Sequence, residues 1–230
     1  MHYFFLIIFL ILLLLFIIVI TSFRMYLRES KKNLNIIEGL TNKNDEENTT
    51  IILIGDSILN NTNYILNEGE SVPDLIKAGH SDTYVFAKDE AVISDCNSQI
   101  EEIPQDNNTD KTYIFVSAGG NNILNSRNNM SKSIIDSLFQ QYSTLIYSLM
   151  SKFPNTNIYI LSLYYPLDSQ FNNLYPFITQ WNSMLFEFAE TNKLKVIYTN
   201  KLLTEPEDFT NSVEPSEAGG KKIADAILES

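Results

Sequence analysis

Five short apolar runs recur along the C-terminal part of the chain, and they constrain the fold more than any other feature. They cover residues 51–54, 83–87, 112–118, 157–163 and 194–198, and each is rich in β-branched and aromatic residues. Runs of this length are too short for helices, and their nearly continuous apolarity is typical of strands buried on both faces. We therefore expect a sheet that is covered on both sides.

Stretches with the spacing of amphipathic helices lie between these runs. The clearest are residues 133–152, 176–192 and 216–228, and a shorter one covers residues 71–78. Strands that alternate with helices form parallel sheets, because a helix supplies the crossover between consecutive strands. The sequence predicts an α/β fold, a three-layer α/β/α sandwich formed by one domain, residues 50–230.

An uninterrupted run of 18 apolar positions, residues 3–20, precedes this domain. It is long enough for a helix to cross a hydrocarbon core of about 30 Å. An uncleaved transmembrane anchor is favoured over a cleaved signal peptide, because the run is long and only His2 separates it from the initial methionine. Residues 21–49 are polar and charged, which indicates a juxtamembrane linker. We expect a single-pass membrane protein.

The charges beside the apolar run predict which side of the membrane the domain faces. Arg24, Arg28, Lys31 and Lys32 follow the run, and no basic residue of this kind precedes it. The positive-inside rule then places the domain on the cytoplasmic side. Four Asn-x-Ser/Thr sequons would indicate the opposite side, but a chain this rich in asparagine, serine and threonine produces several by chance.

Composition excludes several classes of function. A net charge of −12 argues against a nucleic-acid groove, which needs a basic stripe. The single cysteine, Cys96, excludes an internal disulfide framework and a cysteine-rich metal site. The carboxylates lack histidine companions and ligand-like spacing, so we expect neither a metal nor a cofactor. Nothing in the sequence indicates an oligomeric state.

Residues that directly follow the predicted strands are candidates for a site, because open α/β sheets bind ligands at the carboxyl ends of their strands. Gly55-Asp56-Ser57 follows the first run, where the glycine permits a tight turn that leaves the serine hydroxyl exposed and its N–H free. The alternative interpretation is that Ser57 only caps a helix. Gly119-Gly120-Asn121 follows the third run and adds an amide donor of the kind that a developing oxyanion needs.

Together these blocks resemble the GDSL, or SGNH, hydrolase family in their order and spacing. The matching stretches are "GDSIL" at 55–59, "DEAV" at 89–92, "GGNN" at 119–122 and "PSEAGGKKIADAI" at 215–227, so the resemblance covers residues 50–229. It implies a flavodoxin-like sheet of five parallel strands in the order 2-1-3-4-5. It also implies hydrolysis of acyl or acetyl esters of lipids or carbohydrates.

The resemblance assigns roles by position. Ser57 matches the nucleophile and Asn121 a side-chain donor to the oxyanion, and the backbone N–H groups of Ser57, Glu90 and Gly120 match further donors. Glu90 stands where the family usually has glycine, which leaves its N–H available but restricts a positive φ. The residues expected to support these loops are Gly55, Asp56, Gly119, Asn122 and Asn211, of which Asn122 replaces a frequent aspartate.

The last block departs from the family's Asp-x-x-His motif, because its positions read Asn211-Ser212-Val213-Glu214. Of the two histidines, His2 adjoins the apolar run and His80 is expected at the opposite end of the sheet. Glu214 is therefore the titratable residue at the place of the histidine. A carboxylate with an ordinary pKa of about 4.3 is a weak base toward serine, unless burial raises that pKa.

Three classes of function remain open. The first is a membrane-anchored serine ester hydrolase that acts on a small-molecule, glycan or lipid ester, with Glu214 as an atypical base. The second is a weakened or inactive module that binds an acyl, carboxylate or sugar group. The third is a structural membrane-tethered domain. The joint presence of Ser57 and Asn121 favours the first two, while the missing histidine shifts weight toward the second.

Aromatic residues after the fourth run have two interpretations. Tyr164, Tyr165 and Phe171 are placed to wall a substrate pocket, although aromatic residues at such positions more often pack in a core or at its rim. Trp181 has helical spacing with neighbouring apolar residues, and we expect it in the core.

Overall fold

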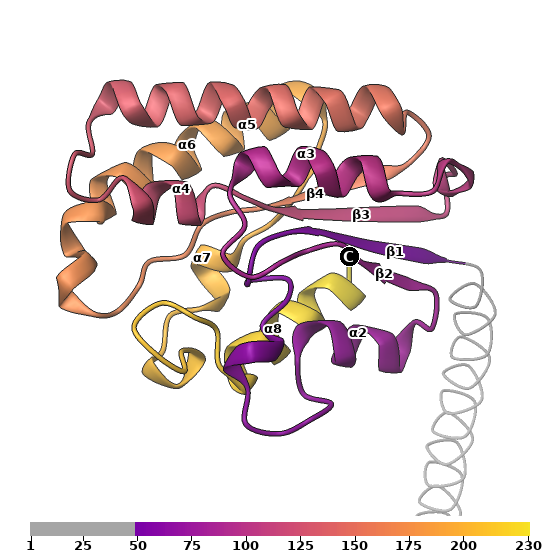
Figure 1. The fold of residues 1–230 in the computed structure, drawn as a ribbon, viewed down its shortest axis with the longest axis horizontal. Helices are drawn as coiled ribbons and strands as arrows, with labels where there is room; N and C mark the ends of the chain where they lie inside the picture. Colours follow the sequence, from indigo (N-terminus) through magenta and orange to yellow (C-terminus); the bar gives the residue numbers. More distant parts are fainter. Residues whose placement is uncertain (1–48) are drawn as a thin grey trace, which may run out of the picture. The chain divides into compact units, whose positions relative to one another are not determined.

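The computed structural model describes residues 49–230 of the chain (Figure 1). The predicted anchor, residues 3–20, lies outside the described residues, as does the predicted linker, residues 21–49, apart from Thr49. Among the helices of residues 49–230, none combines the length and the apolarity that a membrane crossing requires.

Five strands form one parallel sheet in the order β2-β1-β3-β4-β5. Their bounds are Thr50–Gly55 (β1), Thr83–Val85 (β2), Thr112–Ser117 (β3), Asn157–Leu161 (β4) and Lys195–Ile197 (β5). The predicted fold class and the strand order 2-1-3-4-5 are therefore confirmed. The predicted apolar runs overlap all five strands, but four of them continue past the strand into the loop that follows it.

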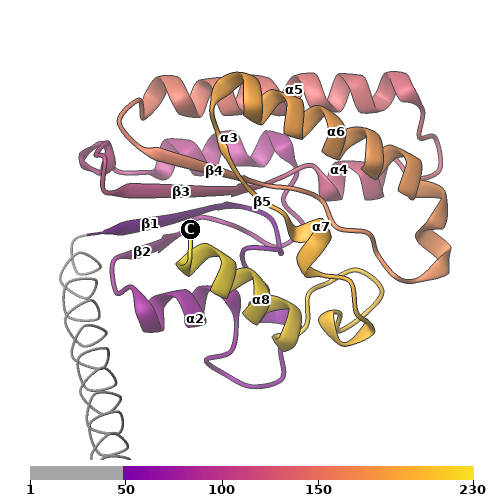
Figure 2. The same cartoon turned by 180° about the vertical axis from the view of Figure 1, so that it is seen from behind.

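Helices connect the strands. The α-helices are Val72–Gly79 (α2), Ile93–Glu102 (α3), Gly120–Asn125 (α4), Lys132–Lys152 (α5), Tyr175–Asn192 (α6), Thr199–Leu202 (α7) and Glu217–Leu228 (α8). Short 3-10 helices cover Thr62–Tyr64 (η1), Gln105–Asn107 (η2), Ser169–Leu174 (η3) and Pro206–Asp208 (η4). The sequence predicted α2, α5, α6 and α8, whereas α3, α4 and α7 were not predicted. Figure 2 shows the same elements from behind.

The helices cover both faces of the sheet, as the three-layer prediction requires. Helices α3, α5 and α6 lie on one face, and α2 and α8 lie side by side on the other (Figures 1 and 2). Strand β1 shows how one strand serves both layers, because successive side chains point to opposite faces. Ile52 and Ile54 join the core beneath α3 and α5, while Ile51 and Leu53 join the core beneath α2 and α8.

The two outer strands differ from the expectation that all five are buried on both faces. Strand β1 is buried along its whole length, whereas β2 exposes Tyr84 and β5 exposes Lys195. An edge strand has a neighbour on one side only, and the covering helices reach it incompletely. Continuous apolarity therefore identified the strands correctly but did not separate the edge of the sheet from its centre.

Serine side chains fix where several helices begin. Ser216 Oγ accepts a hydrogen bond from Gly219 N at the start of α8, and Ser71 Oγ accepts one from Asp74 N at the start of α2. Such caps satisfy N–H groups that have no partner inside the helix. The capping residue Ser216 lies two residues after Glu214, and α8 begins at Glu217, so the segment that carries Glu214 is an irregular loop and not a helix.

Candidate active site

The turn after β1 is fixed by glycine geometry and by one buried amide. Gly55 has a φ of +132°, and a Cβ at this position would lie 1.8 Å from the carbonyl oxygen of Ser117. The Gln99 side chain, from α3, accepts a hydrogen bond from Gly55 N at 2.7 Å and donates one to Gly55 O at 3.0 Å. The chain therefore leaves the sheet along one defined path, which delivers Ser57 to its carboxyl edge.

Asp56 lies beside the nucleophile candidate and is buried. Its Oδ1 accepts hydrogen bonds from Ser117 Oγ at 2.8 Å and from Ile58 N at 3.2 Å. Burial raises the pKa of Asp56 to about 7, although both hydrogen bonds act in the opposite direction. Asp56 thus braces the turn, and it also contributes a second carboxyl group to the pocket.

The block after β3 brings an amide side chain to the same edge. Gly119 has a φ of +107°, and a Cβ there would lie 2.3 Å from the ring of Trp181. Asn121 Nδ2 donates to the carbonyl oxygen of Ala91 at 3.0 Å, which leaves its second amide hydrogen available to a ligand. Asn122 Oδ1 accepts from Ile93 N at 3.0 Å and so ties α4 to the start of α3.

Glu90 adopts the left-handed conformation that glycine would take in the second block. Its φ is 58°, a conformation that costs a residue with a side chain roughly 1–2 kcal/mol. The turn around it is closed by a hydrogen bond from Ala91 N to Lys88 O. Glu90 itself does not line the pocket, and its role as a backbone donor stays a prediction.

Glu214 sits on a loop, residues 209–215, that closes on itself. A bridge joins Phe209 to Pro215, and Thr210 N donates to Glu214 O at 3.0 Å. Asn211 Oδ1 accepts from Val213 N and from Glu214 N, each at 2.9 Å. Asn211 therefore shapes the backbone of the loop.

The Tyr164 hydroxyl attaches this loop to the segment after β4. It donates to Val213 O at 2.6 Å, and the Tyr164 ring packs against Phe209 with centroids 5.4 Å apart. Since Val213 directly precedes Glu214, this contact fixes the loop next to the candidate base.

The Glu214 carboxyl group interacts with Ser57 and has a raised pKa. Burial is the largest cause, the charges of Asp89 and Glu90 raise the pKa further, and a hydrogen bond from the Ser57 side chain opposes them. Glu214 Oε2 is buried and has no hydrogen-bond partner within residues 49–230. A carboxylate with a raised pKa is a stronger base than an ordinary one, and here it lines the same pocket as Ser57.

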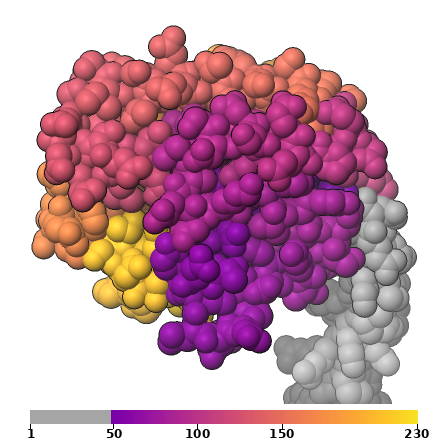
Figure 3. All heavy atoms as spheres, in the orientation of Figure 1, coloured from indigo at the N-terminus to yellow at the C-terminus, as the bar shows by residue number. Residues whose placement is uncertain are grey.

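The three candidate residues Ser57, Asn121 and Glu214 line one pocket with a cavity volume of about 40 Å³. Asp56 and Gly120 line it as well, whereas Glu90, Asn122 and Asn211 do not. Its other lining residues are Ile58, Ile123, Leu124, Leu163, Tyr164, Pro166, Leu174, Ile178 and Val213. In Figure 3 the yellow segment around residue 210 lies against the indigo segment that follows β1 and the orange segment that precedes α6.

The aromatic candidates divide between the pocket and the core. Tyr164 lines the pocket. Tyr165 and Phe171 do not line the pocket, and they pack against the main hydrophobic core. Trp181 is fully buried in that core, as predicted. His80 follows α2 and precedes β2, which places it at the amino end of the sheet, away from the pocket.

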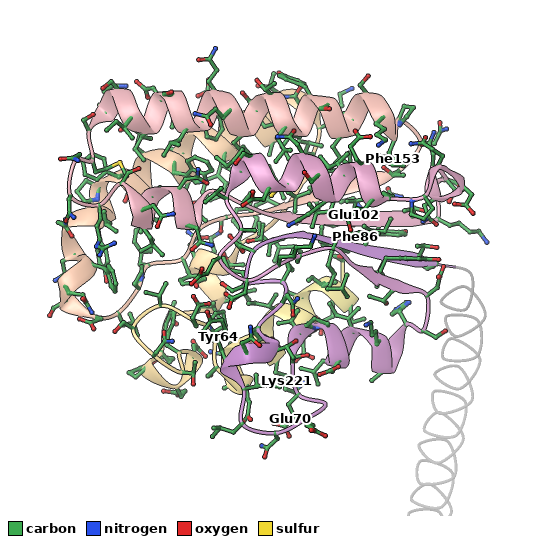
Figure 4. All side chains as sticks on the ribbon, viewed as in Figure 1. Tyr64, Glu70, Phe86, Glu102, Phe153 and Lys221 are labelled. Atoms are coloured by element: carbon green, nitrogen blue, oxygen red, sulfur yellow. The ribbon has the colours of Figure 1, made fainter. Side chains whose placement is uncertain are left out.

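Sequence reasoning missed Tyr64 and Asp89, which lie next to the site. The Tyr64 hydroxyl donates to Asp89 Oδ1 at 2.8 Å, and the charge of Glu214 contributes to raising the pKa of Tyr64. Figure 4 shows Tyr64 projecting from η1 toward the carboxyl end of the sheet. Asp89 belongs to the block at 89–92, in which the sequence assigned this residue no role, and 24 residues separate it from Tyr64. Only the fold brings the two together.

No protein-family model matches the sequence, and no curated protein matches it either. Solved structures do match. A member of the lipolytic G-D-S-L family from Veillonella parvula is 21% identical, with a TM-score of 0.63 over 79% of this chain and 97% of that one. The lipase/acylhydrolase from Enterococcus faecalis is 19% identical, with a TM-score of 0.58 over 79% and 94%. The acetyl xylan esterase AlAXEase is 16% identical, with a TM-score of 0.58 over 78% and 98%.

These similarities concern the fold. Residues 49–230 fold like GDSL lipolytic proteins, which confirms the resemblance seen in the sequence blocks. The glutamate at the place of the histidine remains a feature of this chain that the comparisons leave open.

Proposed function

We propose that this chain is a serine ester hydrolase in which Ser57 is the nucleophile and Glu214 the base. The observation that carries the proposal is that Ser57, Glu214 and Asn121 line one pocket, in which the Ser57 side chain lowers the pKa of Glu214 against the effect of burial. A nucleophile in contact with a base, close to an amide donor, is the arrangement that acyl transfer requires.

In the first half of the reaction, Ser57 Oγ attacks the ester carbonyl carbon while its proton moves to Glu214. The carbonyl oxygen becomes an oxyanion that accepts hydrogen bonds from Asn121 Nδ2 and from the N–H groups of Ser57 and Gly120. The tetrahedral intermediate then collapses, the bond to the alcohol breaks, and the alcohol leaves with the proton from Glu214. The product of this half is an acyl ester of Ser57.

In the second half, Glu214 removes a proton from water, which attacks the acyl carbon. Collapse of this intermediate returns the proton to Ser57 Oγ and releases the carboxylic acid. The raised pKa of Glu214 makes both proton transfers easier than they would be for an exposed glutamate. The base remains weaker than a histidine, so we expect slow turnover and a preference for activated esters.

The substrates we propose are acyl or acetyl esters of lipids or carbohydrates. Structures with the same fold carry the names lipase, acylhydrolase and acetyl xylan esterase, which supports ester hydrolysis as the class of reaction. We also propose that residues 3–20 anchor the protein in a membrane, with the domain on the cytoplasmic side. Recovery of the intact chain in the soluble fraction after an alkaline carbonate wash would contradict the anchor.

The decisive experiment measures hydrolysis of p-nitrophenyl acetate by the purified full-length chain. We expect measurable turnover in the wild type and a loss of about 10³-fold or more in Ser57→Ala. Ser98→Ala is the matched control, because Ser98 is exposed on α3 and does not line the pocket. Equal activity in wild type and Ser57→Ala would remove the serine from the mechanism.

A second candidate function is a module that binds an acyl, carboxylate or sugar group without turnover. The observation that favours it is the crowding of carboxyl groups around Glu214, because the charges of Asp89 and Glu90 favour the protonated form, which is no base. The double variant Asn211→Asp with Glu214→His restores the residue types of a catalytic dyad. An inert wild type together with an active double variant would establish this candidate over the hydrolase.

A further inference from the structure

We propose that the pocket accepts a short, uncharged acyl group of about two to four carbons and excludes both long fatty-acyl chains and acyl groups that carry a carboxylate. This inference rests on the proposed function, because it takes ester hydrolysis as the reaction. The choice of acyl group is inferred from the shape and the charge of the pocket. It assigns the acyl part of the substrate and leaves the alcohol part open.

The volume of the pocket sets the length of the acyl group. The cavity measures about 40 Å³. A single water position takes roughly 10–15 Å³ on this scale, so the cavity holds about three or four atoms of that size. Pockets for larger ligands measure roughly 300 Å³ or more. An acetyl to butyryl group fills the space, whereas an octanoyl chain does not fit inside it.

The wall of the pocket is part of the hydrophobic core, so displacing it costs free energy. Ile123, Leu174 and Ile178 line the pocket, and they are only 1%, 0% and 4% exposed, respectively. All three belong to the main hydrophobic core. Such cores are packed as densely as organic crystals, so a longer chain would have to displace buried side chains. The apolar wall also favours a hydrocarbon group over a polar one.

The charges of the pocket determine that the acyl group is uncharged. Two carboxyl groups, those of Asp56 and Glu214, line the pocket. Within residues 49–230, no lysine or arginine lines it. Asp89 and Glu90 add negative charge close to Glu214. A carboxylate on the acyl group would lose its water and meet like charges without a counter-ion. Succinyl and similar groups should therefore be rejected.

The first test compares p-nitrophenyl acetate, butyrate and octanoate as substrates of the full-length chain. We expect kcat/KM for the octanoate to lie at least about tenfold below that for the butyrate, since the buried wall leaves no room for the additional methylene groups. Equal or higher kcat/KM for the octanoate would overturn the proposal.

A variant enlarges the pocket to test whether its wall sets the limit. In Ile178→Ala we expect the octanoate-to-acetate ratio of kcat/KM to rise by about tenfold or more. Ile227→Ala is the matched control, because Ile227 is also buried but lies in α8 and does not line the pocket. Melting temperatures of both variants show whether each is folded. An unchanged ratio in folded Ile178→Ala would contradict the role of the wall.

A binding measurement separates this proposal from the proposed function. Saturation-transfer NMR on the full-length Ser57→Ala variant detects ethyl butyrate, ethyl octanoate and monoethyl succinate without any turnover. We expect saturation of the ethyl butyrate acyl protons only. This pattern in a chain whose wild type hydrolyses no ester would refute the hydrolase and retain the acyl preference. Equal saturation of all three esters, or of none, would refute the acyl preference.

Discussion

The two segments that meet at the pocket are built in different ways. The turn after β1, which carries Ser57, is enclosed by β3 and α3 through Ser117 and Gln99. The loop of residues 209–215, which carries Glu214, is held by contacts within itself, by the Tyr164 hydroxyl and by a hydrogen bond from Ser212 Oγ to Asp168 Oδ2. The nucleophile is thus positioned by the centre of the fold, and the base by a surface loop.

This difference teaches which property each segment controls. Changes in the turn after β1 disturb packed backbone at the centre of the sheet, so they act mainly on the free energy of unfolding. Changes in the loop of residues 209–215 leave the core intact, so they act mainly on the position and the pKa of the base.

The largest effect is expected on activity, from the base itself. Glu214→Gln keeps the size of the side chain but removes the base, so kcat/KM for p-nitrophenyl acetate should fall by about 10²–10⁴-fold. In the wild type kcat/KM should rise with pH through the raised pKa of Glu214, and the variant should lose this dependence.

Glu187→Gln is the control for this change, because Glu187 is exposed on α6. Both variants should melt within a few degrees of the wild type. An unchanged pH profile in Glu214→Gln would assign the base to another group.

The second prediction concerns the turn after β1. Gly55→Ala places a Cβ 1.8 Å from Ser117 O at a φ of +132°, so it should lower the free energy of unfolding by about 4 kcal/mol or more. Gly69→Ala also has a positive φ, of +87°, but its Cβ meets nothing within 4 Å, and it should cost only about 1 kcal/mol. Urea unfolding of both variants measures the difference, and equal costs would show that the turn is not tightly packed.

The third prediction concerns the dependence of stability on pH. Asp56 has a pKa of about 7 in the folded chain and 3.8 as its ordinary value, so the folded state binds more protons between these values. The contribution of Asp56 to stability is therefore fully present below pH 4 and is lost as the pH rises to about 7.

Asp56→Asn removes this contribution and keeps Oδ1 as an acceptor. The variant should gain stability relative to the wild type by about 2–4 kcal/mol between pH 4 and pH 7. Urea unfolding across this pH range measures the gain. A constant difference between the two proteins would show that Asp56 does not titrate there.

The smallest effect is expected where the loop is attached. Tyr164→Phe removes the hydrogen bond to Val213 O and should lower kcat/KM by about tenfold, with a loss of about 1 kcal/mol in stability. Tyr165→Phe is the control, because the Tyr165 hydroxyl contacts Thr179 and the residue does not line the pocket. Equal kinetics in the two variants would show that the loop holds its position without Tyr164.

Local sequence features determined the fold class of this protein and the candidate residues of its site. Short β-branched runs are typical of strands, and helical stretches between them favour a parallel sheet, so the α/β fold could be predicted from pattern. The glycines at 55 and 119 marked the ends of β1 and β3, where they permit a positive φ. The candidate residues Ser57, Asn121 and Glu214 were likewise named from blocks in the sequence.

Only the tertiary structure decided what surrounds these residues. Gln99 acts on the site from a position far along the chain, and no local pattern distinguishes it from an ordinary helix residue. The sequence singled out Tyr164 and the block that contains Asp89, but only the fold brings them next to Val213 and Glu214. Glutamate at position 90 argued against a left-handed turn, yet the packed fold imposes that conformation. The pKa of Glu214 depends on burial and on charges brought together by folding, because solvation and Coulomb interactions depend on distances in space and not along the sequence.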